Sequence, residues 1–156
     1  MSVDIFKYRD WVLETEREQT EALYKKISLG GAESCHCGTC KYFVSIRESL
    51  YPDEVKNLFE KLGIDITKEV EVCDFGDDET GYIFSWWFHF IGQIVEGSDC
   101  NVPLPSGGST IDLIQIDEVF SVGFTQNISL PFIKEQQGLI QVELMTKVPK
   151  NPLTKN

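Results

Sequence analysis

The sequence is poor in basic residues and contains no long hydrophobic run. Fourteen Lys and Arg stand against 25 Asp and Glu, so the formal net charge at pH 7 is -11. A chain with this charge repels phosphate backbones, which argues against nucleic-acid binding and favours a positively charged protein partner. No window approaches the roughly 18 apolar residues of a membrane-spanning helix, and residues 1–4 do not start a cationic and apolar leader. We therefore expect a cytoplasmic protein with no membrane partner.

The motifs that mark common enzyme active sites are also missing. The sequence has no G-x-S-x-G nucleophile motif, no phosphate-binding loop, no dinucleotide glycine fingerprint and no zinc-deaminase signature. Gly107 and Gly108 precede a predicted strand rather than a helix, so they do not form a phosphate-binding turn. These absences predict a protein that is not an enzyme.

Length and composition indicate one domain. The chain has 156 residues, of which 42% are hydrophobic, and this is enough to bury a core without disulfides. Neither low-complexity sequence nor a repeat of fixed period occurs. We expect residues 1–156 to form a single domain with a flexible tail at 149–156, and a homodimer is compatible with the sequence.

The first half of the chain is predicted to be mainly helical. Residues 4–28 carry apolar side chains at near-helical spacing, and the two glycines at 30 and 31 end this helix. A second helix is predicted at 52–62, because a proline suits its first turn and Gly63 suits its end. Between the two helices, the apolar residues at 43–46 predict a short strand.

From Glu69 onward the apolar pattern changes to a period of two residues, which is typical of strands. The longest predicted strand, 82–95, is apolar on both faces and must therefore be central in its sheet, and Gly92 marks a bulge or bend in it. The prolines and glycines of 96–110 predict a loop that takes no part in a sheet. Other strands are predicted at 69–73, 111–116, 119–124, 128–133 and 139–148. The sequence thus predicts an α+β fold, with two helices packed on one face of an antiparallel sheet of four to six strands.

Three of the five cysteines lie within six residues. Cys35, Cys37 and Cys40, joined by Cys73 after the second helix, can place four thiolates around a tetrahedral Zn²⁺. The C-x-C-x-x-C spacing with one distant cysteine differs from the two C-x-x-C pairs of common zinc sites. His36 or His89 is therefore an alternative to Cys73.

Other interpretations of the cysteines stay open. They can be small buried hydrophobic residues, or Cys37 and Cys40 can form a redox-active pair. A nucleophilic Cys37 or Cys40 with His89 as its base would make the protein an enzyme. However, a lone histidine between Phe88 and Phe90 is more often a hydrogen-bonded core residue, and no third orienting group is apparent.

Acidic side chains gather at two places in the sequence. They lack the twelve-residue pattern of a calcium-binding loop, so we interpret them as solvated surfaces that attract a basic partner. The candidate partner-binding residues are Asp74, Asp77, Asp78 and Glu79 before the longest strand, and Glu14 and Glu18 in the first helix.

Several short motifs together resemble a group of small uncharacterised bacterial proteins with a C-x-C-G-x-C motif. The resemblance covers about residues 35–95, although Lys41 and Tyr42 depart from its pattern. Small acidic proteins of this kind resemble immunity proteins, which neutralise a basic toxin such as a nuclease. The resemblance implies a non-enzymatic acidic inhibitor of a basic partner, and the alternative is a zinc-binding structural or regulatory protein. The motifs are Cys35-x-Cys37-Gly38-x-Cys40-x-x-Phe43, Tyr51-Pro52, Leu62-Gly63-Ile64-Asp65, the acidic strand Glu69 to Val72, and Trp87-Phe88-His89-Phe90-Ile91-Gly92.

Overall fold

The structure is a computed structural model that describes residues 3–78, 81–131 and 136–148. Glu79, the end of the predicted strand at 128–133 and the predicted tail at 149–156 lie outside these ranges. The described elements, in chain order, are β1 (Asp4–Tyr8), β2 (Trp11–Thr15), α1 (Arg17–Lys25), α2 (Gly31–Ser34), α3 (Gly38–Leu50), α4 (Asp53–Leu62), β3 (Glu71–Asp78), β4 (Gly81–Glu96), β5 (Asn101–Pro103), β6 (Ser109–Ile111), β7 (Ile114–Gln115), β8 (Phe120–Thr125) and β9 (Leu139–Val148).

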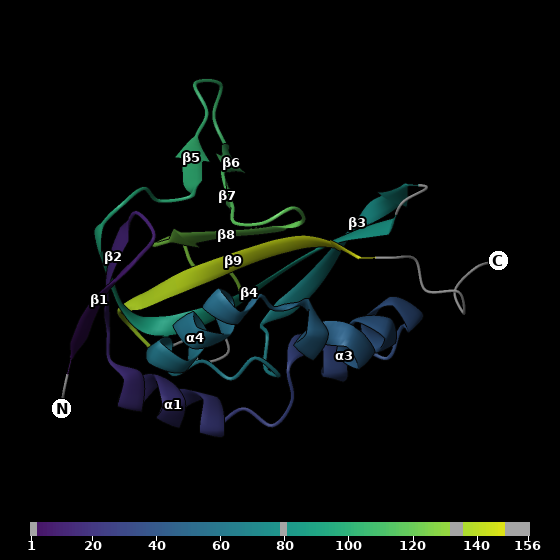
Figure 1. The fold of residues 1–156 in the computed structure, drawn as a ribbon, viewed down its shortest axis with the longest axis horizontal. Coiled ribbons are helices and arrows are strands. Elements are labelled where there is room, and N and C mark those ends of the chain that lie inside the picture. The colour runs from purple at the N-terminus through teal and green to yellow at the C-terminus, as the bar shows by residue number, and fades with distance from the viewer. Residues whose placement is uncertain (1–2, 79–80, 132–135, 149–156) are drawn as a thin grey trace.

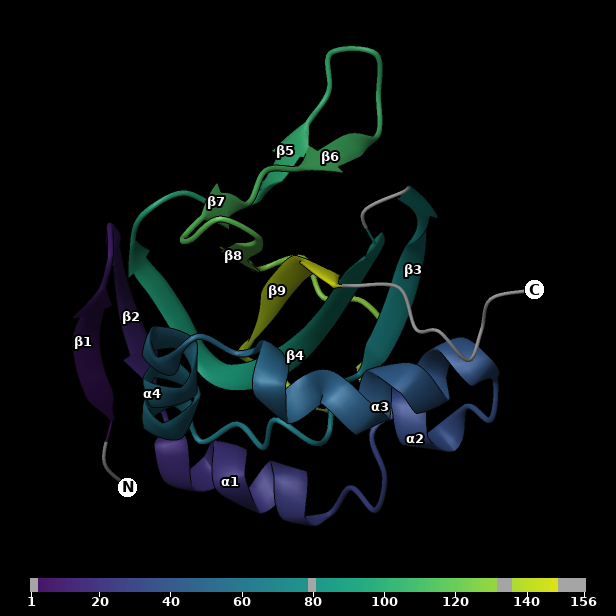
Figure 2. The ribbon, with the colours of Figure 1, turned by 45° about the vertical axis from the view of Figure 1, so that its right-hand side comes forward.

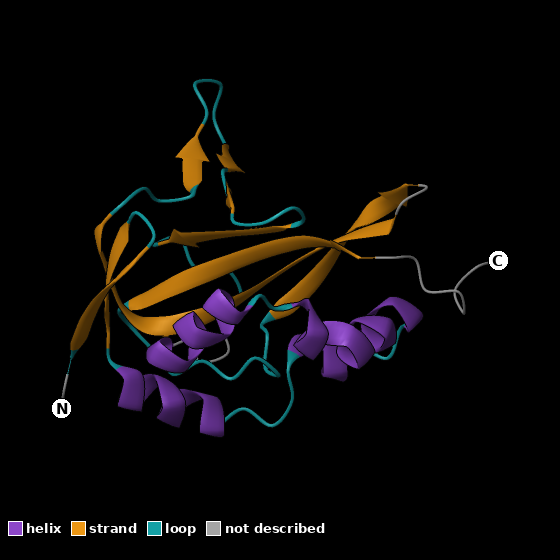
Figure 3. Ribbon diagram, viewed as in Figure 1, coloured by secondary structure: helices purple, strands orange, loops and turns teal. Residues whose placement is uncertain are grey.

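The fold is α+β, as the sequence predicts. Seven strands form one antiparallel sheet in the order β1-β2-β4-β9-β8-β7, with β3 also paired to β4, and β5 and β6 form a separate hairpin. The helices lie on one side of the sheet, and the β5–β6 hairpin projects from the other side (Figures 1, 2 and 3). The described residues form four helical segments rather than two, and none of these helices is long and apolar enough to cross a membrane.

Strand β4 is the centre of the sheet, in agreement with the strand predicted at 82–95. One of its edges pairs with β9 from Tyr82 to Ile91. Its other edge pairs with β3 near its start and with β2 near its end. Because both edges are paired and both faces are covered, every residue from Phe84 to Ile91 is buried.

Helix α1 fills the gap between β2 and β3 along that second edge. The hydroxyl of Tyr24 donates to the carbonyl of His89 at 2.7 Å and accepts from its N–H at 3.0 Å. Two residues further along β4, the N–H of Ile91 donates to the hydroxyl of Thr20, and its carbonyl accepts from the N–H of Glu16. Side chains of a helix thus pair strand backbone that would otherwise be buried without partners.

Aromatic side chains connect the helices to the sheet. Phe43 of α3 packs edge-on against Trp86 with 5.1 Å between ring centroids, and Phe59 of α4 packs against Phe88 at 5.0 Å. The indole N–H of Trp86 donates to the hydroxyl of Tyr51 at 2.7 Å, so the largest buried ring also has its polar atom paired. These contacts fix α3 and α4 on the face of β4 that carries Phe84, Trp86 and Phe88.

The helix predicted at 4–28 is wrong for its first half. Strands β1 and β2 form a hairpin in which Tyr8 pairs with Trp11 across a two-residue turn, and Arg9 in this turn has a φ of 50°. Trp11 packs against Phe124 of β8 with ring centroids 4.8 Å apart, and Leu13 is fully buried. This burial against distant strands outweighs the helical spacing of the apolar residues, and only 17–25 are helical.

Four further predictions are corrected. The strand expected at 43–46 is part of α3, where Phe43 and Arg47 are both buried at the spacing of one helical turn. The loop expected at 96–110 contains β5 and most of β6, in which Pro103 pairs with Ser109. A proline is tolerated there because this hairpin consists of edge strands only. Residues 126–131 form no strand, and β6 and β7 divide the strand expected at 111–116.

Helix α4 begins and ends close to the prediction. Pro52 precedes its first residue as the N-cap, and Gly63 adopts a left-handed φ of 82° after its last residue. The N–H of Ile64 then donates to the carbonyl of Phe59 at 3.0 Å, which closes the helix end. A side chain at Gly63 would also lie 2.5 Å from the carbonyl oxygen of Arg17.

Candidate metal centre

The structure brings Cys35, Cys37 and Cys40 together at the start of α3. Their three sulfur atoms all lie within 4.8 Å of one another. Cys35 and Cys37 are exposed and Cys40 is partly buried, so the cluster is open to solvent. Cys73 lies on β3 opposite Ser85 and is not part of this group, which among the described residues contains three cysteines.

The position of Cys37 explains how the cluster forms locally. Cys37 is the N-cap of the 13-residue helix α3, and its sulfur accepts a hydrogen bond from the backbone N–H of Cys40 at 3.3 Å. The unpaired N–H groups at a helix start favour a negatively charged group, and this bond lowers the pKa of Cys37. Burial, together with hydrogen bonds to Cys35 and Cys37, raises the pKa of Cys40 to about 12.

The separation of the sulfurs fits a thiolate-bound metal ion. Zinc–sulfur bonds of about 2.3 Å in a tetrahedral site place the sulfurs roughly 3.8 Å apart. The three sulfurs all lie within 4.8 Å of one another. Side-chain rotations that move each sulfur by about 1 Å or less therefore bring them to this separation. The three residues therefore suit a soft cation, with one coordination position left for another donor.

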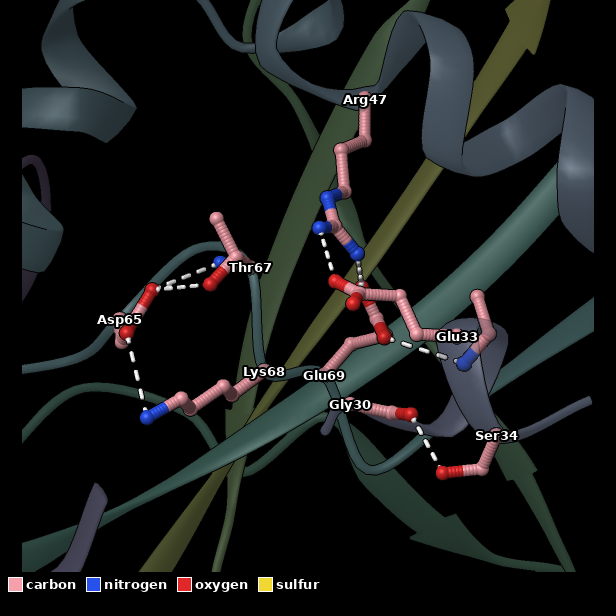
Figure 4. Close-up of polar contacts among 9 residues, drawn as sticks. Gly30, Glu33, Ser34, Arg47, Asp65, Thr67, Lys68 and Glu69 are labelled. Carbon is pink, nitrogen blue, oxygen red and sulfur yellow. Dashed lines mark hydrogen bonds and ion pairs between the residues drawn. The ribbon is translucent and has the colours of Figure 1, made fainter. Parts of the chain in front are cut away.

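A buried ion-pair network holds the cluster in place. Arg47 reaches from α3 to the carboxylates of Glu69 and Glu33, as Figure 4 shows, with 3.2 Å between its Nη1 atom and Oε1 of Glu69. The other oxygen of Glu69 accepts the N–H of Ala32 at 3.1 Å, and its backbone carbonyl accepts the N–H of Gly31. Helices α2 and α3, on either side of the cysteines, are thus fixed to the same residue.

Glu69 is fully buried within this network. Burial raises its pKa to about 7, although the N–H of Ala32 and the charge of Arg47 oppose this shift. Close packing at this point also explains the paired glycines, because a side chain at Gly30 would lie 2.3 Å from Oε2 of Glu69. A side chain at Gly31 would lie 2.3 Å from the carbonyl oxygen of Val70. The two glycines therefore allow close approach to residues 69 and 70 at the start of α2, whereas the sequence pattern predicts that they end the first helix.

The sequence offers two histidines as substitutes for the fourth cysteine. His36 is exposed, and it lines a shallow surface depression together with Cys35 and Lys41. His89 is buried on the sheet face that points away from α3 and α4, where its Nε2 atom lies 2.9 Å from Oε1 of Gln141 on β9. Burial lowers the pKa of His89. His36 is therefore the histidine whose position suits the thiol cluster.

The predicted acidic residues occupy separate parts of the molecule. Asp74 and Asp77 are exposed on β3, where Asp77 pairs with Tyr82 near the start of β4. Glu14 is partly buried on β2 and pairs with Gln93 near the end of β4, and Glu18 is exposed on α1. Eleven residues of strand separate the two positions, which is about 35 Å along β4. The backbone of Asp78 belongs to β3, and Glu79 lies outside the described residues.

The distribution of charged residues along the sequence locates the acidic surface better than the six candidate residues do. Residues 69–133 contain eleven acidic residues and no Lys or Arg, and the remainder of the chain is balanced at 14 acidic and 14 basic residues. The whole formal charge of -11 therefore belongs to the segment that forms β3 to β8. Most of the large hydrophobic residues found exposed in the structure also lie here: Phe75, Val95, Val102, Leu104, Ile111, Ile114, Val119 and Leu130.

The sequence motifs at 35–95 correspond to defined parts of the fold. The C-x-C-G-x-C motif forms the three-cysteine cluster, and the later motifs belong to α4, β3 and β4. Comparisons of this chain with protein-family models, curated protein sequences and solved structures find no match, and no family is assigned to it.

Proposed function

We propose that this protein binds a zinc ion through Cys35, Cys37 and Cys40. The observation that carries this proposal is the mutual approach of their three sulfurs within 4.8 Å at an exposed helix start. Thiolates are the softest ligands in proteins and suit Zn²⁺, and cytoplasmic thiols are kept reduced and able to bind it. Solvent, His36 or a group from a partner supplies the fourth donor.

The surrounding contacts favour a binding role over a role in holding the fold together. Arg47, Glu69 and Glu33 already fix α2 to α3, and the sulfur of Cys37 caps α3. The contacts that hold the cysteines in position do not involve a metal, so the cluster resembles a ligand set that is in place before the metal binds. In contrast, domains that fold only around zinc depend on the metal for their structure.

Metal titration of the reduced, tag-free protein tests the proposal. We expect one Zn²⁺ per chain by elemental analysis, and Co²⁺ substitution should give the strong sulfur-to-cobalt absorption of a thiolate site. Cys37→Ser and Cys40→Ser should abolish stoichiometric binding, whereas Cys73→Ser should not. Well under one zinc per chain in the reduced wild type, or equal loss in the Cys73 variant, would contradict the three-cysteine site.

A second candidate function is the binding of a basic protein, as an immunity-type inhibitor does. It is supported by the concentration of the net charge in residues 69–133 and by exposed apolar side chains in the same segment. Exposed apolar patches bordered by charged residues are typical of protein interfaces. Within this segment, the β5–β6 hairpin projects from the sheet and presents Val102, Leu104 and Ile111 to solvent.

This candidate is tested by capture of proteins from the source cells at increasing salt. We expect a basic protein whose retention falls with ionic strength, because exposed charge pairs are screened. Replacing Asp112, which directly follows β6, by Asn and Glu118, in the turn between β7 and β8, by Gln should weaken retention. The matched variant with Glu14 and Glu18 replaced by Gln loses the same charge on β2 and α1, outside residues 69–133, and should retain the partner. Equal weakening by both variants would contradict a localised interface.

A further inference from the structure

We propose that the metal-free cluster is a thiol–disulfide exchange site in which Cys37 and Cys40 form a disulfide at the expense of a low-molecular-weight disulfide such as glutathione disulfide. This activity goes beyond metal binding and does not require it. Only the final step below, in which oxidation releases zinc, rests on the proposed function.

The geometry of the pair carries the inference. Cys37 and Cys40 are joined by a C-x-x-C spacing across the first turn of α3, and their sulfurs lie within 4.8 Å of one another. The hydrogen bond from the N–H of Cys40 already turns the sulfur of Cys37 toward that turn. Formation of a bond of about 2.05 Å then needs rotation of the two side chains but no movement of either helix.

Unequal exposure gives the two sulfurs different roles. Cys37 is exposed and can meet an incoming disulfide, whereas Cys40 is partly buried. Cys100 is only 2% exposed and lies away from the cluster in sequence and in structure, so it provides an internal comparison. Access therefore makes Cys37 rather than Cys40 the attacking residue, with Cys40 as the resolving residue. Cys35 is also exposed, and it is the hydrogen bond of the Cys37 sulfur to the N–H of Cys40 that distinguishes Cys37 from it.

The exchange proceeds in two steps. The thiolate of Cys37 attacks one sulfur of glutathione disulfide, its S–S bond breaks, and one glutathione thiolate leaves. The thiolate of Cys40 then attacks the Cys37 sulfur of the mixed disulfide and expels the second glutathione thiolate. Two protein thiols are oxidised, one glutathione disulfide is reduced to two glutathione molecules, and the two protons of the cysteines pass to the released thiolates through water.

Oxidation changes the capacity of the cluster for metal. A Cys37–Cys40 disulfide leaves Cys35 as the one thiolate of the group, and a single thiolate does not hold Zn²⁺ against solvent. The network of Arg47, Glu33 and Glu69 contains no cysteine, so it keeps α2 and α3 in place in both redox states. The exchange thus acts as a local switch of metal affinity.

The direct test uses the full zinc-free chain in glutathione redox buffers. After alkylation of the remaining thiols, peptide mass analysis with fragmentation should find the Cys37–Cys40 disulfide, with Cys35, Cys73 and Cys100 alkylated. Cys40→Ser should stop at the mixed disulfide on Cys37, and Cys37→Ser should abolish the exchange. Serine is a good N-cap, so the latter variant is expected to keep α3 folded. A persistent mixed disulfide in the wild type, or a pair formed by other cysteines, would overturn the proposal.

The coupling to zinc is tested separately. The zinc-loaded chain is treated with glutathione disulfide, and released metal is followed with a chromogenic indicator. We expect one disulfide per zinc released and recovery of binding after reduction. Full retention of zinc by the oxidised chain would overturn the coupling alone. If the reduced chain binds no zinc, the proposed function fails, but the exchange measured on the zinc-free chain still stands or falls by its own result.

Discussion

The hydroxyl of Tyr24 forms two hydrogen bonds with the backbone of one residue, His89, because it donates to the carbonyl and accepts from the N–H. Tyr24 is 3% exposed, and burial raises the pKa of its hydroxyl far above the usual value, so it stays protonated and able to donate. One side chain thereby replaces a neighbouring strand at the centre of the sheet.

Replacing Tyr24 by Phe should therefore destabilise the protein strongly. The substitution leaves one buried N–H and one buried carbonyl unpaired, and we expect a loss of roughly 2–4 kcal/mol in the free energy of unfolding. Urea denaturation followed by tryptophan fluorescence measures it. The matched change Tyr8→Phe removes a partly buried bond to Glu54 and should cost about 1 kcal/mol. Equal losses for the two variants would refute the special role of Tyr24.

Replacing Arg47 should destabilise the protein, because it leaves a buried carboxylate unpaired. Arg47→Met keeps the length of the side chain but leaves Glu69 without its cation, and we expect a loss of about 3–5 kcal/mol. Adding Glu69→Gln to this variant should recover part of the loss, since no charge then remains buried. If the double variant is as unstable as the single one, the ion pair is not what holds α2 to α3.

The raised pKa of Glu69 predicts a specific pH dependence. Its folded pKa is about 7, above the usual 4.5, so between these values the folded state binds the proton more tightly than the unfolded state. The contribution of this group to stability is greatest below pH 4.5 and is lost as the pH rises through 7, by up to roughly 3 kcal/mol. The difference in the free energy of unfolding between the wild type and Glu69→Gln, measured across this pH range, isolates the contribution of Glu69, since His89 titrates in both. A difference that does not change with pH would contradict the shift.

Zinc should raise the unfolding temperature of the wild type but not of Cys40→Ser. At a free zinc concentration a hundredfold above the dissociation constant, a ligand that binds only the folded state adds about 2.7 kcal/mol. Thermal unfolding in buffered zinc, with and without a chelator, measures this effect. An equal rise in the Cys40 variant would indicate that the metal binds elsewhere on the chain.

Gly92 should not tolerate a side chain. An added Cβ atom would lie 1.9 Å from the carbonyl oxygen of Glu14, so Gly92→Ala must push β2 away from β4 and should cost about 1–3 kcal/mol. The control is Gly38→Ala at the start of α3, where the added atom meets nothing within 4 Å and a helix-forming residue should be neutral or slightly stabilising. Comparable costs at both positions would contradict the close approach of the strands.

Local patterns predicted the elements whose causes are local. Pro52 and Gly63 bound α4 through backbone conformations that these residues favour wherever they occur. The apolar residues on both faces of β4 likewise identify a strand that is covered on both sides. The closeness of Cys37 and Cys40 also follows from their spacing within one turn.

Features that depend on distant contacts could not be predicted in this way. The residues of β1 and β2 have apolar spacing that suits a helix as well as a strand, and the choice is made by contacts such as that of Trp11 with Phe124. Nothing in the sequence shows which strand edge Cys73 occupies, so the sequence alone does not separate it from the other cysteines. The positions of Glu14 and Asp74 near opposite ends of β4 likewise depend on strand register, which the sequence does not show.

The arrangement around β4 also determines when the sheet can form during synthesis. Strand β2 leaves the ribosome early but has to wait for Gln93 and Ile94, and β4 in turn has to wait for β9 to cover its other edge. One edge of β4 therefore stays unpaired in the growing chain until β9 emerges. Long-range pairing of this kind slows folding and exposes strand edges to misassembly. We expect ribosome-bound chains that stop between β4 and β9 to require chaperones that bind hydrophobic segments.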